Sequence, residues 1–178
     1  VLLRNADVAM YHSKKTGKNR IKLFDQAMFV SAFERLEMKV ELDHALERNE
    51  LTLHYQPFVT LGASRVIGFE ALLRWTHPTL GSVPPGSFVP LVEETGAIVE
   101  MGAWALVEAC AQLASWTNAF GSDLVMSVNV SPRQLDDDRL VEDVRRALVI
   151  SGIDPRSLTL EITESAGLDD PEPRERLV

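Results

Sequence analysis

After Asn49 the sequence alternates strand-like and helical segments, and this alternation restricts the fold more than any other feature. Period-two or continuously apolar runs predict four strands, at Leu51–Gln56, Val66–Leu73, Leu124–Val130 and Leu158–Thr163. Helical periodicity predicts helices at Ser87–Thr95, Met101–Trp116 and Leu140–Ser151. Strands separated by helices form βα units, which build a parallel sheet with its ligand site at the carboxyl ends of the strands. We therefore predict an α/β fold, either an open sheet or half of an eight-stranded (β/α)8 barrel, and the pattern weakly favours the barrel.

These elements also carry local signals for packing and for helix ends. Ser131 is a good N-cap, with Pro132 at the first helical position and Gln134 where a capping-box partner belongs. Gly152 is expected to end the helix that precedes it. The strand Val66–Leu73 is expected to be buried on both sides. The helix Met101–Trp116 is expected to bury Trp104, Val107, Ala111 and Ala114.

The first 35 residues differ from the rest in charge and in pattern. They carry 7 Lys/Arg against 3 Asp/Glu, whereas residues 36–178 carry 11 against 23. A helix is predicted over Asn5–Lys15 and a short strand over Arg20–Phe24, and a second helix, capped by Asp25, is predicted to reach about Asn49. The long polar stretch between Asp25 and Leu36 indicates a domain boundary.

Composition excludes several classes of protein. With 46% hydrophobic and 25% charged residues, the chain is typical of a soluble globular protein. The main body is acidic, so it offers no basic footprint for duplex nucleic acid, and an anionic ligand there would need a metal cation or a few placed arginines. The longest uncharged run, Trp75–Val92, contains four prolines and cannot form a continuous membrane helix. Cys110 is the only cysteine, so no intrachain disulfide can form, and its apolar helical setting predicts a packed thiol.

The ends of the sequence suggest a piece of a longer chain. It opens at Val1 without an initiator Met and stops inside the charged, proline-containing stretch Asp169–Arg176. No export signal is recognisable, so a cytoplasmic location is expected, and a parent protein tethered to a membrane through upstream regions stays open.

Polar residues late in three apolar strands form the candidate site. Glu70, Asn129 and Glu161 each interrupt such a strand, and strand alternation turns them toward a common interior. Two carboxylates and an amide oxygen suit Mg²⁺, Mn²⁺ or Ca²⁺ rather than Zn²⁺. The alternative is that each is a separate, hydrogen-bonded strand-end residue, and the pattern favours neither interpretation.

Other polar residues allow two interpretations each. Arg74 could hold a phosphate or form a surface salt bridge. Gln56 could contact a base or phosphate or simply end a strand, and Glu164 could brace a loop or be solvated. The histidines show no metal-ligand spacing and are expected at the surface or the rim; they are His12, His44, His54 and His77. Trp104 and Trp116 are expected to pack in the core rather than stack on bases.

Several motifs in order resemble the EAL domain of bacterial cyclic di-GMP phosphodiesterases. They are Tyr55–Pro57, Glu70–Trp75, Phe88–Gly96, Asn129–Leu135 and Glu161–Ser165. Residues 1–28 resemble the last helix and strand of a GGDEF (diguanylate cyclase) domain, which suggests a GGDEF tail at 1–28, a helical linker at 29–35 and the N-terminal half of an EAL domain at 36–178.

The resemblance implies a (β/α)8 TIM-like barrel that binds two Mg²⁺ or Mn²⁺ ions and hydrolyses cyclic di-GMP to linear pGpG. Carried over residue by residue, it makes Glu70, Asn129 and Glu161 metal ligands and Gln56, Leu72 and Arg74 substrate contacts. Glu70 and Glu164 take the catalytic roles, Glu164 by bracing a loop near the metals. Homodimerisation through the complete domain is a family expectation.

The chain departs from the family pattern because the later motifs would lie beyond Val178. These are a paired Asp-Asp, a catalytic Lys and a further Glu, and the cyclase signature loop is likewise missing upstream. Four strands cannot close a barrel, which leaves unpaired edges. We therefore expect this piece alone to be inactive. The alternatives are a non-catalytic cyclic di-GMP receptor, which intact metal ligands argue against, and a purely structural or interaction module.

Overall fold

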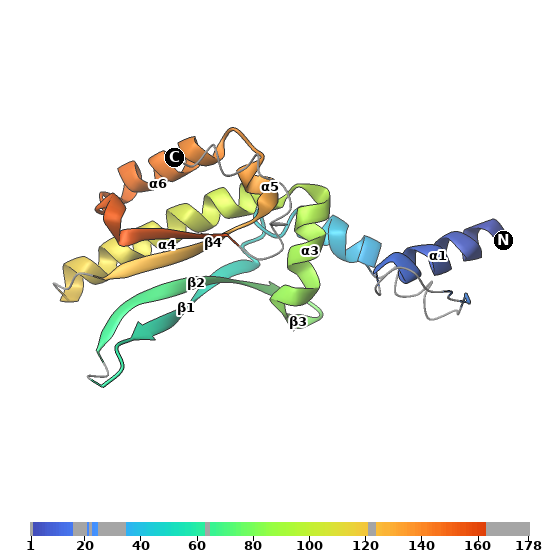
Figure 1. Cartoon of the computed structure of the whole chain (residues 1–178), viewed down its shortest axis with the longest axis horizontal. Coiled ribbons are helices and arrows are strands. Elements are labelled where there is room, and N and C mark those ends of the chain that lie inside the picture. Colours follow the sequence, from blue (N-terminus) through green and yellow to red (C-terminus); the bar gives the residue numbers. More distant parts are fainter. Residues whose placement is uncertain are drawn as a thin grey trace. The chain divides into compact units, whose positions relative to one another are not determined.

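The computed structural model describes residues 2–15, 21, 23–24, 35–62, 65–120 and 124–162 (Figure 1). It divides into two compact units, residues 1–44 and 45–178, which are described separately. In the first unit, α1 spans Leu2–Lys15 and residues 35–42 are helical. The expected helix at Asn5–Lys15 is thus confirmed, while most of the expected strand Arg20–Phe24 lies outside the described residues. The second helix does not reach Asn49, because residues 43–49 form turns.

The described part of the second unit is built on one five-stranded sheet. Its strands are β1 (Leu51–Val59), β2 (Val66–His77), β3 (Gly81–Val83), β4 (Val125–Val130) and β5 (Leu158–Ile162). The order is β1-β2-β4-β5, and β3 pairs with β2. The β2–β4 and β4–β5 pairs are parallel, as predicted.

Two features of the sheet differ from the prediction. β1 runs antiparallel to β2 because only a short turn joins them, and a parallel pair needs a crossover of a dozen or more residues. β3, a short antiparallel partner of β2, was not predicted.

β2 is also not buried on both sides. Val66 and Ile67, at its start, are 38% and 40% exposed.

Helices follow the strands where the periodicity placed them. They are α3 (Pro85–Thr95), α4 (Ile98–Phe120), α5 (Pro132–Leu135) and α6 (Leu140–Ser151), with a 3₁₀ turn η1 at Pro155–Ser157. The capping box at Ser131 and Gln134 is present, and Gly152 ends α6 in the left-handed conformation. Figure 1 shows α4 and α6 side by side along the sheet.

The core lies between the sheet and these two helices. Met126, Val128 and Val130 of β4 pack against α4 and against Leu140 and Ala147 of α6. Cys110 is fully buried there, and burial raises the pKa of its thiol to about 11, which confirms the packed thiol.

The predicted inner face of α4 is wrong in phase. The helix buries the residues Ile98, Met101, Gly102, Ala105, Leu106, Ala109, Cys110 and Leu113. Trp104, Val107 and Ala114 are only half-buried, and Ala111 is exposed. The polar stripe of Glu108, Gln112 and Ser115 lies outside the face that these buried residues form, and the prediction did not use it to set the phase of the helix.

In the described parts of the chain, no single helix is long and apolar enough to cross a membrane. Only the pair α3 and α4, bent by 120° at its junction, meets those criteria jointly.

Candidate functional site

The parallel ladders bring the three predicted ligand residues onto neighbouring strands. Glu70 of β2 stands opposite Ser127 of β4, and Asn129 of β4 stands opposite Glu161 of β5. β4 turns Met126 and Val128 toward the helical core, so alternation turns Ser127 and Asn129 to the other face. Glu70, Asn129 and Glu161 therefore share one region of the sheet.

Hydrogen bonds tie these side chains together. Asn129 Nδ2 donates to Glu70 Oε1 at 2.8 Å, and Ser127 Oγ donates to Glu161 Oε1 at 2.5 Å. Glu70, Asn129 and Glu161 are each half-buried, whereas Ser127 is 3% exposed. Each carboxylate thus has a neutral donor that satisfies one oxygen, as a partly buried charge requires.

The donor chemistry of this group fits a hard divalent cation. Glu70, Glu161 and the amide oxygen of Asn129 are the oxygen ligands that Mg²⁺ and Mn²⁺ prefer. Within the described residues, no group of three or more His, Cys, Asp and Glu side chains is arranged to hold a metal. The three side chains could therefore supply only part of the coordination shell of Mg²⁺, which is near-octahedral.

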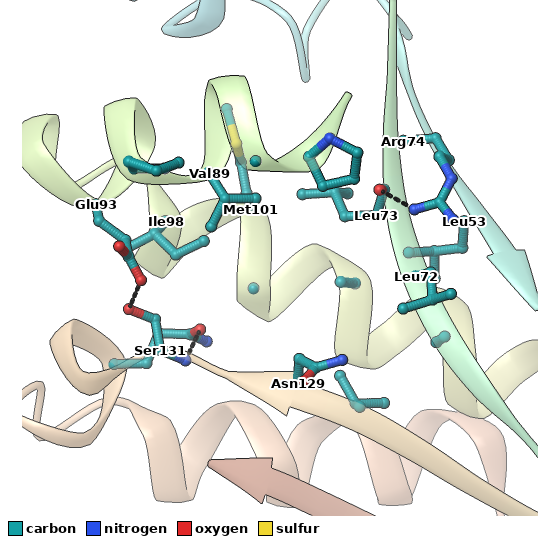
Figure 2. Close-up of a pocket in the computed structure, with 18 residues that line it drawn as sticks. Leu53, Leu72, Leu73, Arg74, Val89, Glu93, Ile98, Met101, Asn129 and Ser131 are labelled. Carbon is teal, nitrogen blue, oxygen red and sulfur yellow. Dashed lines mark hydrogen bonds between the residues drawn. The ribbon is translucent and has the colours of Figure 1, made fainter. Parts of the chain in front are cut away.

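A cavity of about 370 Å³ opens beside Asn129 (Figure 2). Its walls are mostly apolar and come from β2, α3 and α4, and its polar rim includes Arg74, Glu93, Asn129 and Ser131. An apolar pocket with a few convergent polar groups is the usual form of a small-molecule site.

The predicted substrate-contact residues Gln56, Leu72 and Arg74 lie on the same face of β1 and β2 as Glu70. Leu72 and Arg74 line the cavity, and Arg74 Nη1 donates to the backbone oxygen of Leu73 at 2.9 Å. Gln56 is exposed and stands opposite Glu70 in the β1–β2 register. Glu164 lies outside the described residues.

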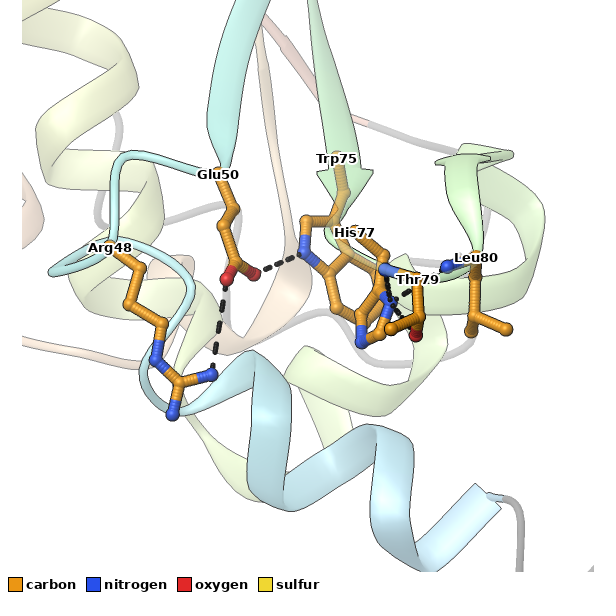
Figure 3. A network of polar contacts seen from close by, with 6 residues as sticks. All are labelled: Arg48, Glu50, Trp75, His77, Thr79 and Leu80. Carbon is orange, nitrogen blue, oxygen red and sulfur yellow. Dashed lines mark hydrogen bonds and ion pairs between the residues drawn. The ribbon is translucent and has the colours of Figure 1, made fainter.

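A buried polar network holds the end of β2 next to Arg74 (Figure 3). Trp75 is fully buried, and its Nε1 donates to Glu50 Oε2 at 3.0 Å. Arg48 lies 3.9 Å from the other oxygen of Glu50. His77 Nδ1 accepts the backbone N–H groups of Thr79 and Leu80 at 3.1 and 3.0 Å.

The expected placement of the histidines and tryptophans is correct only in part. His77 is 6% exposed rather than a surface residue, because its ring closes the turn after β2. His44 and His54 are exposed, and the side chain of His12 lies outside the described residues. Trp116 packs against Tyr55 and Phe69 with ring centroids 4.9 and 4.3 Å away, and Trp104 is half-buried.

Two residues at the cavity rim were missed as functional candidates. Glu93 Oε1 accepts a hydrogen bond from Ser131 Oγ at 2.8 Å, which joins α3 to the turn after β4. The sequence marked Ser131 only as a helix cap and gave no role to Glu93, which lies inside the motif Phe88–Gly96.

The parallel strands, the acidic cluster and the adjacent cavity define an α/β domain with a candidate site at its sheet, and comparison with protein families identifies the family of this domain. Residues 39–177 match the EAL domain family, so the chain belongs to the EAL family.

Two curated relatives are cyclic di-GMP enzymes of Pseudomonas aeruginosa by name. The bifunctional diguanylate cyclase/cyclic di-GMP phosphodiesterase MucR is 45% identical over 169 residues, which cover 95% of this chain and 25% of MucR. The cyclic di-GMP phosphodiesterase NbdA is 39% identical over 165 residues, which cover 93% of this chain and 21% of NbdA. The chain thus spans about a quarter of the length of these proteins.

The fold comparison agrees. The solved structure of the MucR phosphodiesterase in complex with c-di-GMP superposes with a TM-score of 0.72 at 44% identity. The match covers 76% of this chain and 55% of that chain, so the matched EAL structure contains elements beyond those described here.

Proposed function

We propose that this chain contributes the N-terminal half of an EAL domain that hydrolyses cyclic di-GMP to linear pGpG. The observation that carries the proposal is the cluster of Glu70, Asn129 and Glu161 beside the Arg74 cavity, in a chain that belongs to the EAL family. Relatives of this chain carry the phosphodiesterase name, and one was solved with c-di-GMP.

In this proposal Glu70, Asn129 and Glu161 hold Mg²⁺ or Mn²⁺, with two ions in the complete domain. A bound divalent cation supplies Lewis-acid stabilisation of the phosphoryl oxygens and lowers the pKa of a bound water. The carboxyl groups of Glu70 and Glu161 would repel an anionic substrate, and a bound cation would offset this repulsion.

The remaining residues orient the substrate. Arg74 places a planar guanidinium at the cavity rim, where it can bind one phosphate in a bidentate manner. Leu72 forms an apolar wall for the nucleotide, Gln56 is a polar contact on β1, and Glu164 braces a loop near the metals.

The proposal also covers the organisation of the protein. We assign residues 1–28 to the tail of a GGDEF domain, 29–35 to a helical linker and 36–178 to the EAL half-domain. The other ligands and the strands that close the barrel come from sequence outside these residues, so the isolated chain is inactive. The parent protein acts in the cytoplasm, and the complete domain dimerises.

The test uses the native polypeptide that contains this sequence. We expect Mg²⁺- or Mn²⁺-dependent conversion of cyclic di-GMP to pGpG, and Glu70→Ala to lower the rate about 100-fold or more, since even outer partners of a metal site contribute roughly 10- to 100-fold. Glu142→Ala is the matched control, because within the described residues the ion pair of this exposed α6 carboxylate is with exposed Arg145.

Two outcomes contradict the proposal. If cyclic di-GMP binds without metal and is not hydrolysed, the protein is a receptor. If it neither binds nor turns over, the domain has a structural role.

A further inference from the structure

The turn between β4 and α5 is built from buried polar groups immediately after Asn129. Ser131 and Gln134 are 7% and 4% exposed. The backbone N–H of Ser131 donates to Gln134 Oε1 at 3.1 Å, and Ser131 Oγ accepts the N–H of Arg133 at 3.3 Å. Buried polar groups bonded in this reciprocal way give a turn with a single preferred geometry.

Glu93 connects this turn to α3. Glu93 Oε1 accepts a hydrogen bond from Ser131 Oγ, and the two oxygens lie 2.8 Å apart. The two residues are 38 positions apart in the sequence. Figure 2 shows Glu93 reaching from α3 across the cavity rim to Ser131. A hydrogen bond to a carboxylate is stronger than one between neutral groups. The hydroxyl of Ser131 can donate to Glu93 and accept from Arg133 at once, so the two bonds do not compete.

Gly102 of α4 closes the other side of the turn. A Cβ atom at this position would collide with the amide end of Gln134. Gly102 therefore lets the Gln134 side chain lie directly against α4, and α3 and α4 hold the turn from two sides.

We propose that Glu93 is a positioning residue that holds Asn129 in the geometry required of a metal ligand, an inference that rests on the proposed function. Only Val130 separates Asn129 from Ser131, and Val130 is 1% exposed and packed in the core. A displacement of Ser131 is therefore transmitted to Asn129, which has to meet Glu70 on one side and Glu161 on the other. Ligand sets tolerate displacements of only about 0.5 Å.

The test measures the affinity for Mn²⁺ by calorimetry on the native polypeptide without nucleotide. The site of interest is identified as the one whose Mn²⁺ binding is lost in Glu70→Ala. Glu93→Ala is expected to weaken this affinity about 10- to 100-fold. Glu93→Gln keeps an oxygen that accepts the Ser131 hydroxyl, so its affinity is expected to stay within about threefold of the wild type. Glu142→Ala serves again as the exposed control.

A cycle with Ser131→Ala checks the route of the effect. Ser131→Ala removes the bond to Glu93 together with the acceptor of the Arg133 N–H. Glu93→Ala is therefore expected to cause no further loss once Ser131 is alanine, so the double variant should bind Mn²⁺ as weakly as Ser131→Ala alone. If Glu93→Ala does not fold, as judged by circular dichroism, Ser131→Ala decides the matter, and wild-type affinity in that variant overturns the inference.

The failures of the two proposals are distinguishable. A wild-type protein that neither binds Mn²⁺ nor hydrolyses cyclic di-GMP rejects the proposed function and this inference with it. A wild-type protein that does both, with Glu93→Ala binding Mn²⁺ normally, rejects the inference alone. Equal loss in Glu93→Gln and Glu93→Ala also rejects it, because the charge of Glu93 and not its hydrogen bond would then be responsible.

Discussion

Removing the acceptor of the buried Trp75 indole should destabilise the domain measurably. Trp75 is fully buried, Glu50 is 8% exposed, and Trp75 Nε1 lies 3.0 Å from Glu50 Oε2. In Glu50→Ala the indole N–H keeps its desolvated position and loses its acceptor, which costs about 1–3 kcal/mol. The Arg48 contact, at 3.9 Å and with Arg48 52% exposed, adds at most about 1 kcal/mol. We expect a total loss of about 1–4 kcal/mol.

The assay is urea unfolding of the native polypeptide, followed by circular dichroism. Glu50→Gln retains an acceptor oxygen and is expected to lose no more than about 1 kcal/mol. Trp75→Phe removes the donor, and in a double-mutant cycle with Glu50→Ala the coupling is expected to be about 1.5–3 kcal/mol. Additive effects of the two substitutions, or a loss under about 0.5 kcal/mol for Glu50→Ala, would refute the reasoning.

Three further predictions concern the fold. Gly68→Ala should destabilise the domain by about 1–3 kcal/mol in the same urea assay, because the new Cβ would collide with the backbone oxygen of Val125 on β4; an unchanged midpoint would contradict this. Cys110, whose pKa burial raises to about 11, should resist iodoacetamide at pH 8 and react only after unfolding; rapid labelling of the native protein would show that it is accessible. Burial, and then the charge of Glu108, raise the pKa of Tyr55 to about 12. The neutral phenol of Tyr55 therefore contributes fully to stability below about pH 10, and this contribution is lost between about pH 10 and 12. The difference in absorbance between wild type and Tyr55→Phe at high pH should show the ionisation of the Tyr55 phenol.

The polar residues of the candidate site could be predicted because each breaks a local pattern. Glu70, Asn129 and Glu161 are polar positions in otherwise apolar strands, and the parallel register of β2, β4 and β5 does bring them together. Their roles as metal ligands stay a prediction. The hydrogen bonds from Asn129 to Glu70 and from Ser127 to Glu161 were not foreseen, since they depend on side-chain geometry across strands.

The sequence by itself determined the features that depend on neighbours along the chain. The positions of β1, β2, β4 and β5, the capping box at Ser131 and the end of α6 at Gly152 follow from periodicity and from the chemistry of helix ends, which act over a few residues.

Only the tertiary structure decided the features that depend on distant segments. The Glu93–Ser131 contact joins residues 38 positions apart, and no periodic signal encodes such a pair, since it exists only after α3 has packed beside the end of β4.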